Sequence, residues 1–236
     1  MKILDKALEL RNIYNYKTRE PMKTFSKRVS LAQQVLFLVE KYGTPVQKQE
    51  GRRLFMVAVA AGFELYWRDL IRTLIDSKNI TIQSLPNISN IHFSLTDIGQ
   101  IIGKKLTLGE LVSCSYTFQN TEVVNISLSS ILKIDAFKEF SNKKYRLVEV
   151  VKKSVTKKHR PPVNIIIRGI DILKRIKDIN KCFEIRHATV HDTGSMHRIS
   201  LKRAMKISGS VRMFNMFFEM YVYNHINDTK PLPTRF

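Results

Sequence analysis

One short stretch of the sequence, EIRHATVHDTG at residues 184–194, brings an arginine and two histidines together within six positions. The three residues are Arg186, His187 and His191. A histidine gives or takes a proton near neutral pH, and a guanidinium binds a phosphate bidentately and stabilises negative charge on its oxygens. RNA supplies its own nucleophile, the 2′-hydroxyl. These residue types are therefore sufficient for general acid–base cleavage of an RNA phosphodiester.

Two other interpretations of this stretch stay open at the level of sequence. In a helix with about 100° per residue, Glu184, His187 and His191 share one stripe, and Arg186 lies about 140° from His191. In the first alternative, the cationic side chains only stabilise a helix C-terminus against its dipole. In the second, His187 and His191 bind a metal ion with Asp192 or Glu184 as third ligand, although the glutamate of an HExxH motif is missing.

The net charge favours a polyanionic partner. The 236 residues include 40 Lys and Arg against 20 Asp and Glu, which is a formal charge of +20. Repulsion among so many positive charges destabilises a folded chain, so proteins with such an excess usually bind a polyanion. Residues 143–181 alone hold 13 Lys and Arg against three acids. We expect this basic segment to bind nucleic acid through Lys152, Lys153, Lys157, Lys158, Arg160, Lys174 and Lys181.

Apolar residues three and four positions apart predict helices along most of the chain. The predicted helices cover residues 4–16, 25–42, 52–76, 107–120, 127–134, 135–155, 163–191 and 208–226. Thr107 and Glu110 have the spacing of a capping box, and Gly194 is expected to stop the helix that carries the motif. The predicted core faces comprise Phe55, Val59, Phe63, Trp67 and Leu70, and in the last helix Ile207, Val211, Phe214, Phe218, Tyr221 and Val222.

These patterns predict an all-α fold, a bundle of long antiparallel helices with an irregular insertion around residues 77–106. We divide the chain into an N-terminal helical extension at 1–45, a main helical domain at 46–227 and a flexible tail at 228–236. Cys114 and Cys182 form no CxxC pair, so we expect two core hydrophobes and a cytoplasmic location. No apolar stretch reaches the roughly 20 residues that span a bilayer, and we expect no membrane partner.

The motif stretch resembles the HEPN superfamily of metal-independent ribonucleases. RHATVH matches its Arg-x(4–6)-His signature, and EIRHATVHDTG is similar to the RN..VH..G helix end of large bacterial members. FELYWRDLIRTLI and LTLGELVSCSYTFQN resemble an early and a middle helix of those proteins. The resemblance covers roughly residues 50–226. Asparagine or aspartate is commoner at the position of His187, so this histidine is either catalytic or orients Arg186.

The resemblance implies a function and a set of partners. We expect an endoribonuclease in which Arg186 binds the scissile phosphate and His191, with His187, transfers protons; Glu64 and Asp192 are candidates to orient the arginine. Family resemblance implies a homodimer through the motif helices, no cofactor or metal, and a toxin or antiviral defence role with an antitoxin or defence partner protein. The alternative is a non-catalytic basic helical module that binds RNA or serves as an adaptor in a defence complex.

Overall fold

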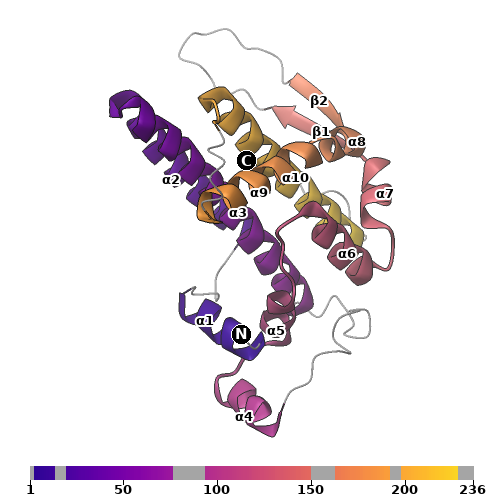
Figure 1. Ribbon diagram of the computed structural model, residues 1–236. Helices are drawn as coiled ribbons and strands as arrows, with labels where there is room; N and C mark the ends of the chain where they lie inside the picture. Colours follow the sequence, from indigo (N-terminus) through magenta and orange to yellow (C-terminus); the bar gives the residue numbers. More distant parts are fainter. Residues whose placement is uncertain (1–2, 14–19, 77–93, 150–162, 192–197, 228–236) are drawn as a thin grey trace, which may run out of the picture.

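The computed structural model describes residues 3–13, 20–76, 94–149, 163–191 and 198–227. The elements follow the chain as α1 (Ile3–Ile13), α2 (Pro21–Tyr42), α3 (Pro45–Asp76), α4 (Leu95–Gly103), α5 (Leu108–Ser115), α6 (Thr121–Leu132), α7 (Ala136–Ser141), β1 (Lys144–Glu149), β2 (Val163–Arg168), α8 (Gly169–Leu173), α9 (Ile176–His191) and α10 (Leu201–Asn227). Figure 1 shows α2, α3 and α10 as the long helices, with α9 packed across α3 and α10. The predicted helical bundle is confirmed.

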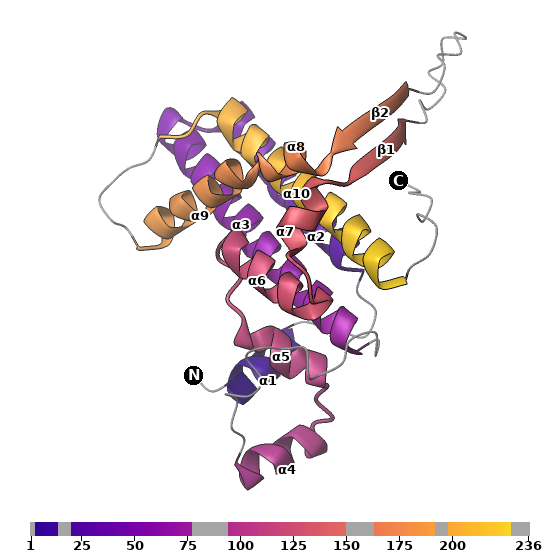
Figure 2. The same ribbon diagram turned by 90° about the vertical axis from the view of Figure 1, so that its right-hand side faces the viewer.

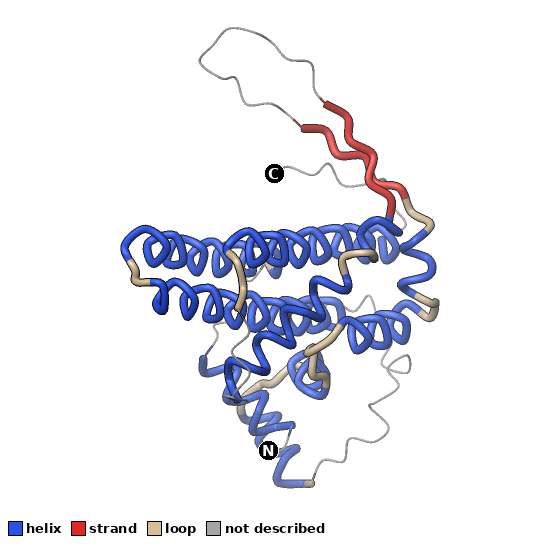
Figure 3. Tube along the Cα trace, turned by 45° about the horizontal axis from the view of Figure 1, so that its top comes forward, coloured by secondary structure: helices blue, strands red, loops and turns tan. Residues whose placement is uncertain are grey.

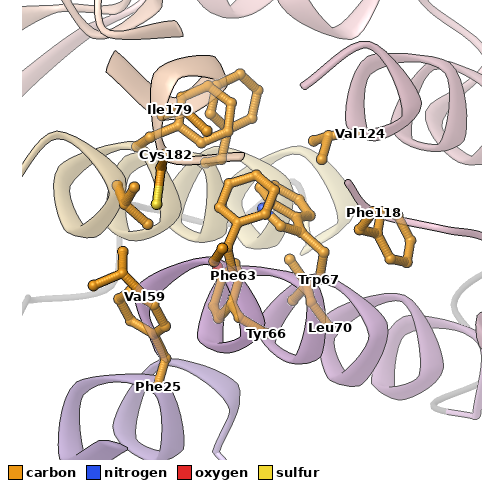
Figure 4. Close-up of a cluster of buried hydrophobic side chains, with 14 of the residues drawn as sticks. Phe25, Val59, Phe63, Tyr66, Trp67, Leu70, Phe118, Val124, Ile179 and Cys182 are labelled. Carbon is orange, nitrogen blue, oxygen red and sulfur yellow. The ribbon is translucent and has the colours of Figure 1, made fainter. Parts of the chain in front are cut away.

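The longest apolar stretch of the sequence forms α3, which lies at the centre of the bundle. All five residues predicted for its core face are buried, and they pack against α2, α9 and α10 (Figure 4). The helix begins seven residues earlier than predicted, at Pro45. Thr44 and Gln47 explain this start, because the Gln47 amide oxygen accepts from the Thr44 N–H at 2.8 Å and the Thr44 hydroxyl accepts from the Gln47 N–H at 3.3 Å. Such a reciprocal cap, with proline at the first position, favours a helix start.

Two hydrogen bonds join α3 to α10 inside the core. The Trp67 indole Nε1 donates to Asn215 Oδ1 at 3.1 Å, and the Tyr66 hydroxyl donates to the Asn215 carbonyl oxygen at 2.9 Å. Asn215 is fully buried, so these bonds satisfy groups that would otherwise destabilise the interior. The predicted core face of α10 is buried throughout. The helix starts at Leu201 rather than at 208, because the Ser200 hydroxyl accepts from the Arg203 N–H at 3.2 Å and caps it.

The predicted helices over 135–155 and 163–191 are wrong in part. The first ends at Ser141 and is followed by β1, while the second is replaced over Val163–Arg168 by β2 and begins as α9 only at Ile176. The two strands pair antiparallel, with Lys144 opposite Arg168 and Tyr145 opposite Ile167. β-branched and aromatic residues prefer an extended backbone once a partner strand is available. The partner strand lies far away in the sequence, so the spacing of neighbouring apolar residues could not reveal it. Figure 2 shows the resulting hairpin projecting from the helical body, and Figure 3 shows its strands in red against the blue helices.

Gly169 seats this hairpin on the bundle. Its N–H donates to the carbonyl oxygen of Lys143 at 2.8 Å, at the point where β2 turns into α8. A Cβ at this position would overlap the carbonyl oxygen of Phe140. The close approach of two backbones therefore requires glycine here.

The N-terminal helix and the middle of the chain form a smaller second core. Leu4 and Ala7 of α1 pack with Leu106, Leu111 and Cys114. The capping box predicted at Thr107 and Glu110 is present and starts α5. Of the predicted insertion, residues 94–106 contain α4, and residues 77–93 lie outside the described part, as does the tail at 228–236. The domain boundary at residue 45 stays a prediction; α2 contributes Phe25, Val29 and Leu36 to the same core as α3.

Candidate functional site

The helix α9 carries the motif and ends at His191, as predicted. Its inner face is held by Ile179, Cys182, Phe183 and Ile185, all of which are buried. The Cys182 thiol donates to the Met56 carbonyl oxygen of α3 at 3.5 Å, and burial raises the pKa of this thiol to about 12. Both cysteines are buried and free, in keeping with their prediction as core hydrophobes. The packed inner face thus fixes the rotation of α9 and with it the direction of the motif side chains.

Arg186 lies on the flank of α9 that faces α3. Its guanidinium forms an ion pair with Glu64, with 3.4 Å between Nη2 and Oε1. The side chains are 28% and 15% exposed, so the pair is partly buried and is better shielded from solvent than an ordinary surface ion pair. Glu64, which the sequence suggested as an orienting acid, therefore contacts the arginine across the α3–α9 interface.

His187 and His191 lie together on the solvent side of the same helix. Their ring centroids are 4.6 Å apart, with planes inclined at 48°, and both side chains are exposed. Val190 lies between the arginine and histidine stripes and is 56% exposed. The structure thus brings the two histidines into contact and places Arg186 on an adjacent flank, where its ion-pair partner is Glu64.

Two residues to which the sequence analysis gave a role near the motif lie outside the described ranges. Asp192, the second candidate to orient Arg186, and Gly194, the predicted helix stop, both lie in the stretch 192–197 that is not described. The chain is described again from Arg198. Ile199 is buried there, and its carbonyl oxygen accepts from Arg52 Nη1 at 3.3 Å, while the same guanidinium pairs with Glu40.

The structure describes two of the seven basic residues predicted to bind nucleic acid. Lys174 lies 3.0 Å from Asp171, and Lys181 lies 2.7 Å from Glu184. The remaining five lie outside the described residues; they are Lys152, Lys153, Lys157, Lys158 and Arg160. These five residues lie in the sequence between β1 and β2, and the two strands themselves carry Lys144 opposite Arg168.

A second charged group, which the sequence analysis missed, lies where α8, α9 and α10 meet. Asp178 of α9 is buried, and its carboxylate lies 3.0 Å from Arg203 Nη2 and 3.8 Å from Lys206 Nζ of α10. The buried Ser210 hydroxyl donates to Asp178 at 3.0 Å and accepts from Arg175 at 3.4 Å. One feature of the sequence could have indicated this group. The run LKRAMK at the start of α10 has an excess of cations at a helix start, where acids are preferred.

The described residues show no arrangement that favours the metal interpretation. Within these ranges, no group of three His, Cys, Asp or Glu side chains is placed to hold an ion. Glu184, one of the two acids proposed as third ligand, pairs with Lys181.

Among the described helices, none is long and apolar enough to cross a membrane.

Comparison of the chain with known protein families, with curated proteins and with solved structures finds no match. The geometry of the site and the chemistry of its residues therefore carry the functional argument.

Proposed function

We propose that this chain is a metal-independent endoribonuclease of the HEPN type. The observation that carries the proposal is the end of α9, where two exposed histidines contact each other and an arginine on the neighbouring flank is held by a partly buried acid. Proton-transfer groups must reach solvent-borne substrate, whereas a phosphate-binding guanidinium gains from being held in one orientation. The two environments at this helix end fit these two roles.

The chemistry needs one base, one acid and one source of positive charge. His191 takes the proton of the 2′-hydroxyl as its oxygen attacks the adjacent phosphorus, and the second histidine protonates the departing 5′-oxygen. One O–P bond forms and one breaks, which leaves a 2′,3′-cyclic phosphate, or the 3′-phosphate derived from it, and a 5′-hydroxyl. Arg186 stabilises the charge on the non-bridging oxygens in the transition state.

The separation of Arg186 from the histidine pair favours a site shared by two copies of the chain. Within one chain the arginine and the histidines lie on adjacent flanks of α9, and the exposed Val190 lies between them. A second α9 packed against this end would cover Val190 and would place the arginine of one copy beside the histidines of the other. Such a two-fold arrangement uses the same surface on both partners.

The same separation is what the second candidate function would predict. A non-catalytic RNA-binding module or adaptor needs exposed cations but no contact between arginine and histidine. The test is therefore product chemistry. Purified protein should cut single-stranded RNA in EDTA to give 2′,3′-cyclic phosphate and 5′-hydroxyl ends, and it should leave DNA and RNA with a 2′-O-methyl group at the cut site intact.

The opposite results have definite meanings. Ends that carry 5′-phosphate, cleavage of DNA or inhibition by EDTA would contradict the 2′-hydroxyl mechanism, because that mechanism needs neither a metal-bound water nor a metal-stabilised leaving group. A dimer that binds RNA and leaves every RNA uncut would instead support the binding-module candidate.

A further inference from the structure

The cluster at the junction of α8, α9 and α10 includes two cations at helix N-termini, where helix electrostatics disfavour them. It comprises Arg203 and Lys206, which pair with Asp178; Arg175, which donates to Ser210; and the adjacent Lys174 and Lys177, and we refer to it as the junction cluster. Lys177 lies in the first turn of α9, and Arg203 lies in the first turn of α10. The N-terminal ends of helices carry positive partial charge, so acids are preferred there and cations are repelled.

The internal acids offset only part of this positive charge. Asp178 balances one cation, and Asp171 pairs with Lys174 and also with Arg168. Five cations in the cluster against these two carboxylates leave an excess of three positive charges even before Arg168 is counted. An anion from outside the chain would offset the remainder, and helix N-termini add their backbone dipoles to its binding.

The buried acid also determines how the cations are presented. Asp178 is almost fully buried, whereas the side chains of Arg203 and Lys206 are 43% and 58% exposed. The carboxylate thus holds the charged ends of two cationic side chains from α10, and both side chains keep much of their surface accessible to solvent. Arg175 is tied to the same point through the buried Ser210 hydroxyl. Cations that are held in place lose less side-chain entropy when they bind a ligand.

The surface of α9 leads from this cluster to the histidines. Lys177, Lys181, Glu184, Ala188 and His191 follow each other at spacings of four, three, four and three, so they form one stripe along the helix. All five residues of the stripe are exposed or partly exposed. At 1.5 Å per residue, the stripe from Lys177 to His191 is about 21 Å long.

We propose that the junction cluster binds the phosphates of a single-stranded RNA and that the strand continues along this stripe of α9 toward His191. The second half of the proposal rests on the proposed function, whereas the phosphate site itself does not. The probe is a fluorescent single-stranded RNA of mixed sequence with 2′-O-methyl groups throughout, which cannot be cut through its 2′-oxygens. Binding is followed by anisotropy between low and moderate salt.

The informative variant is Lys177→Gln with Lys206→Gln, because both side chains are exposed and the ion pair between Asp178 and Arg203 stays intact. Each lost phosphate contact should lower the salt slope by about 0.7, so the double variant should flatten it by roughly 1.4 and weaken binding roughly 25-fold near 0.1 M salt. The matched control is Lys27→Gln with Lys41→Gln on α2, two exposed lysines with the same change in net charge. The control should keep the wild-type slope.

Equal losses in both double variants would overturn the proposal, because the effect would then follow from net charge alone. An unchanged slope in the Lys177→Gln, Lys206→Gln protein, or a wild-type protein that does not bind the RNA at low salt, would also overturn it. Circular dichroism of both variants should match that of the wild type. Cleavage of unmodified RNA is measured separately: specific loss of binding in the cluster variant together with no cleavage by the wild type would keep the phosphate site and reject the nuclease.

Discussion

The two ends of α9 hold their charged side chains in opposite ways. At the N-terminal end, the buried Asp178 carboxylate pairs with Arg203 and Lys206 of α10 and accepts a hydrogen bond from the Ser210 hydroxyl. At the C-terminal end, His187 and His191 are exposed and contact each other, and Arg186 forms an ion pair with Glu64 on another helix. The charged group at the N-terminal end is therefore part of the packing between helices, whereas the histidines at the C-terminal end lie on the surface.

This difference separates stability from activity along a single helix. Removing a buried charged group leaves its partners uncompensated and destabilises the fold. Removing an exposed side chain at a helix end changes stability little. We therefore expect substitutions near residue 178 to change the free energy of unfolding, and substitutions at 186–191 to change the chemistry.

The largest expected effect is on cleavage. His191→Ala and Arg186→Ala should each lower the rate by roughly 100-fold or more, because proton transfer and oxyanion stabilisation each contribute on this scale. His187→Ala should lower it less than His191→Ala. The free energy of unfolding should change by less than about 0.5 kcal/mol for either histidine variant. Cleavage rates and urea unfolding curves are measured on the same preparations.

The contrary result at this end of the helix would be loss of fold. If His191→Ala unfolds the protein, the histidines act as a helix C-terminal cap, and the first alternative interpretation of the motif gains support. Equal losses of activity in the two histidine variants would mean that the two side chains contribute equally to the proton transfers.

The next effect should appear at the other end of α9 and should have the opposite character. Asp178→Ala removes the acceptor of the Ser210 hydroxyl and the counter-charge of Arg203. We expect a loss of about 2–3 kcal/mol in the free energy of unfolding, less than for a fully buried pair because the cations keep access to water. Asp178→Asn retains a hydrogen-bond acceptor and should lose less. An Asp178→Ala protein with wild-type stability would show that the buried carboxylate does not hold the junction together.

The sequence predicted those parts of the fold and site that depend on local pattern. The faces of α3 and α10 follow from apolar spacing, and the start of α5 follows from Thr107 and Glu110, because such signals act within one or two turns. The helix carrying the motif was predicted to end near His191, and it does. The angle between Arg186 and His191 also followed from helix geometry alone.

Tertiary contacts determined what the sequence analysis missed. Tyr145 lies opposite Ile167, 22 positions along the chain, and this pairing turned two predicted helical segments into strands. Asp178 meets Arg203 and Ser210 only because α9 and α10 cross, so the cation-rich start of α10 was visible in the sequence, whereas its buried partner was not. The sequence indicated Glu64 only as a candidate to orient Arg186, and the packing of α9 on α3 places this pair in a partly buried position.

A third acid, Glu219, offers a further test of how burial of a charged group affects stability, and here the expected effect is the smallest. Glu219 of α10 is partly buried, and burial, with a smaller contribution from the nearby Glu20 carboxylate, raises its pKa from 4.5 to about 7. Asp178 lies among cations; Glu219 instead lies near Glu20, Tyr66 and Tyr223, and burial raises the pKa of both tyrosines as well. A buried acid in such surroundings should destabilise the fold when it is ionised, the reverse of Asp178.

The sign of the pH dependence follows from the two states. Below about pH 4.5 the carboxyl is protonated in both the folded and the unfolded chain, and it has no effect. Between pH 4.5 and about 7 the unfolded chain is ionised while the folded chain keeps its proton, so stability falls as the pH rises, and above about 7 the full loss is reached. Glu219→Gln should therefore stabilise the protein by roughly 1–3 kcal/mol at pH 8 and leave stability unchanged near pH 4. Urea unfolding at both pH values measures this difference. A variant that is less stable than the wild type at pH 8 would show that Glu219 acts like Asp178, as an ionised group that the fold needs.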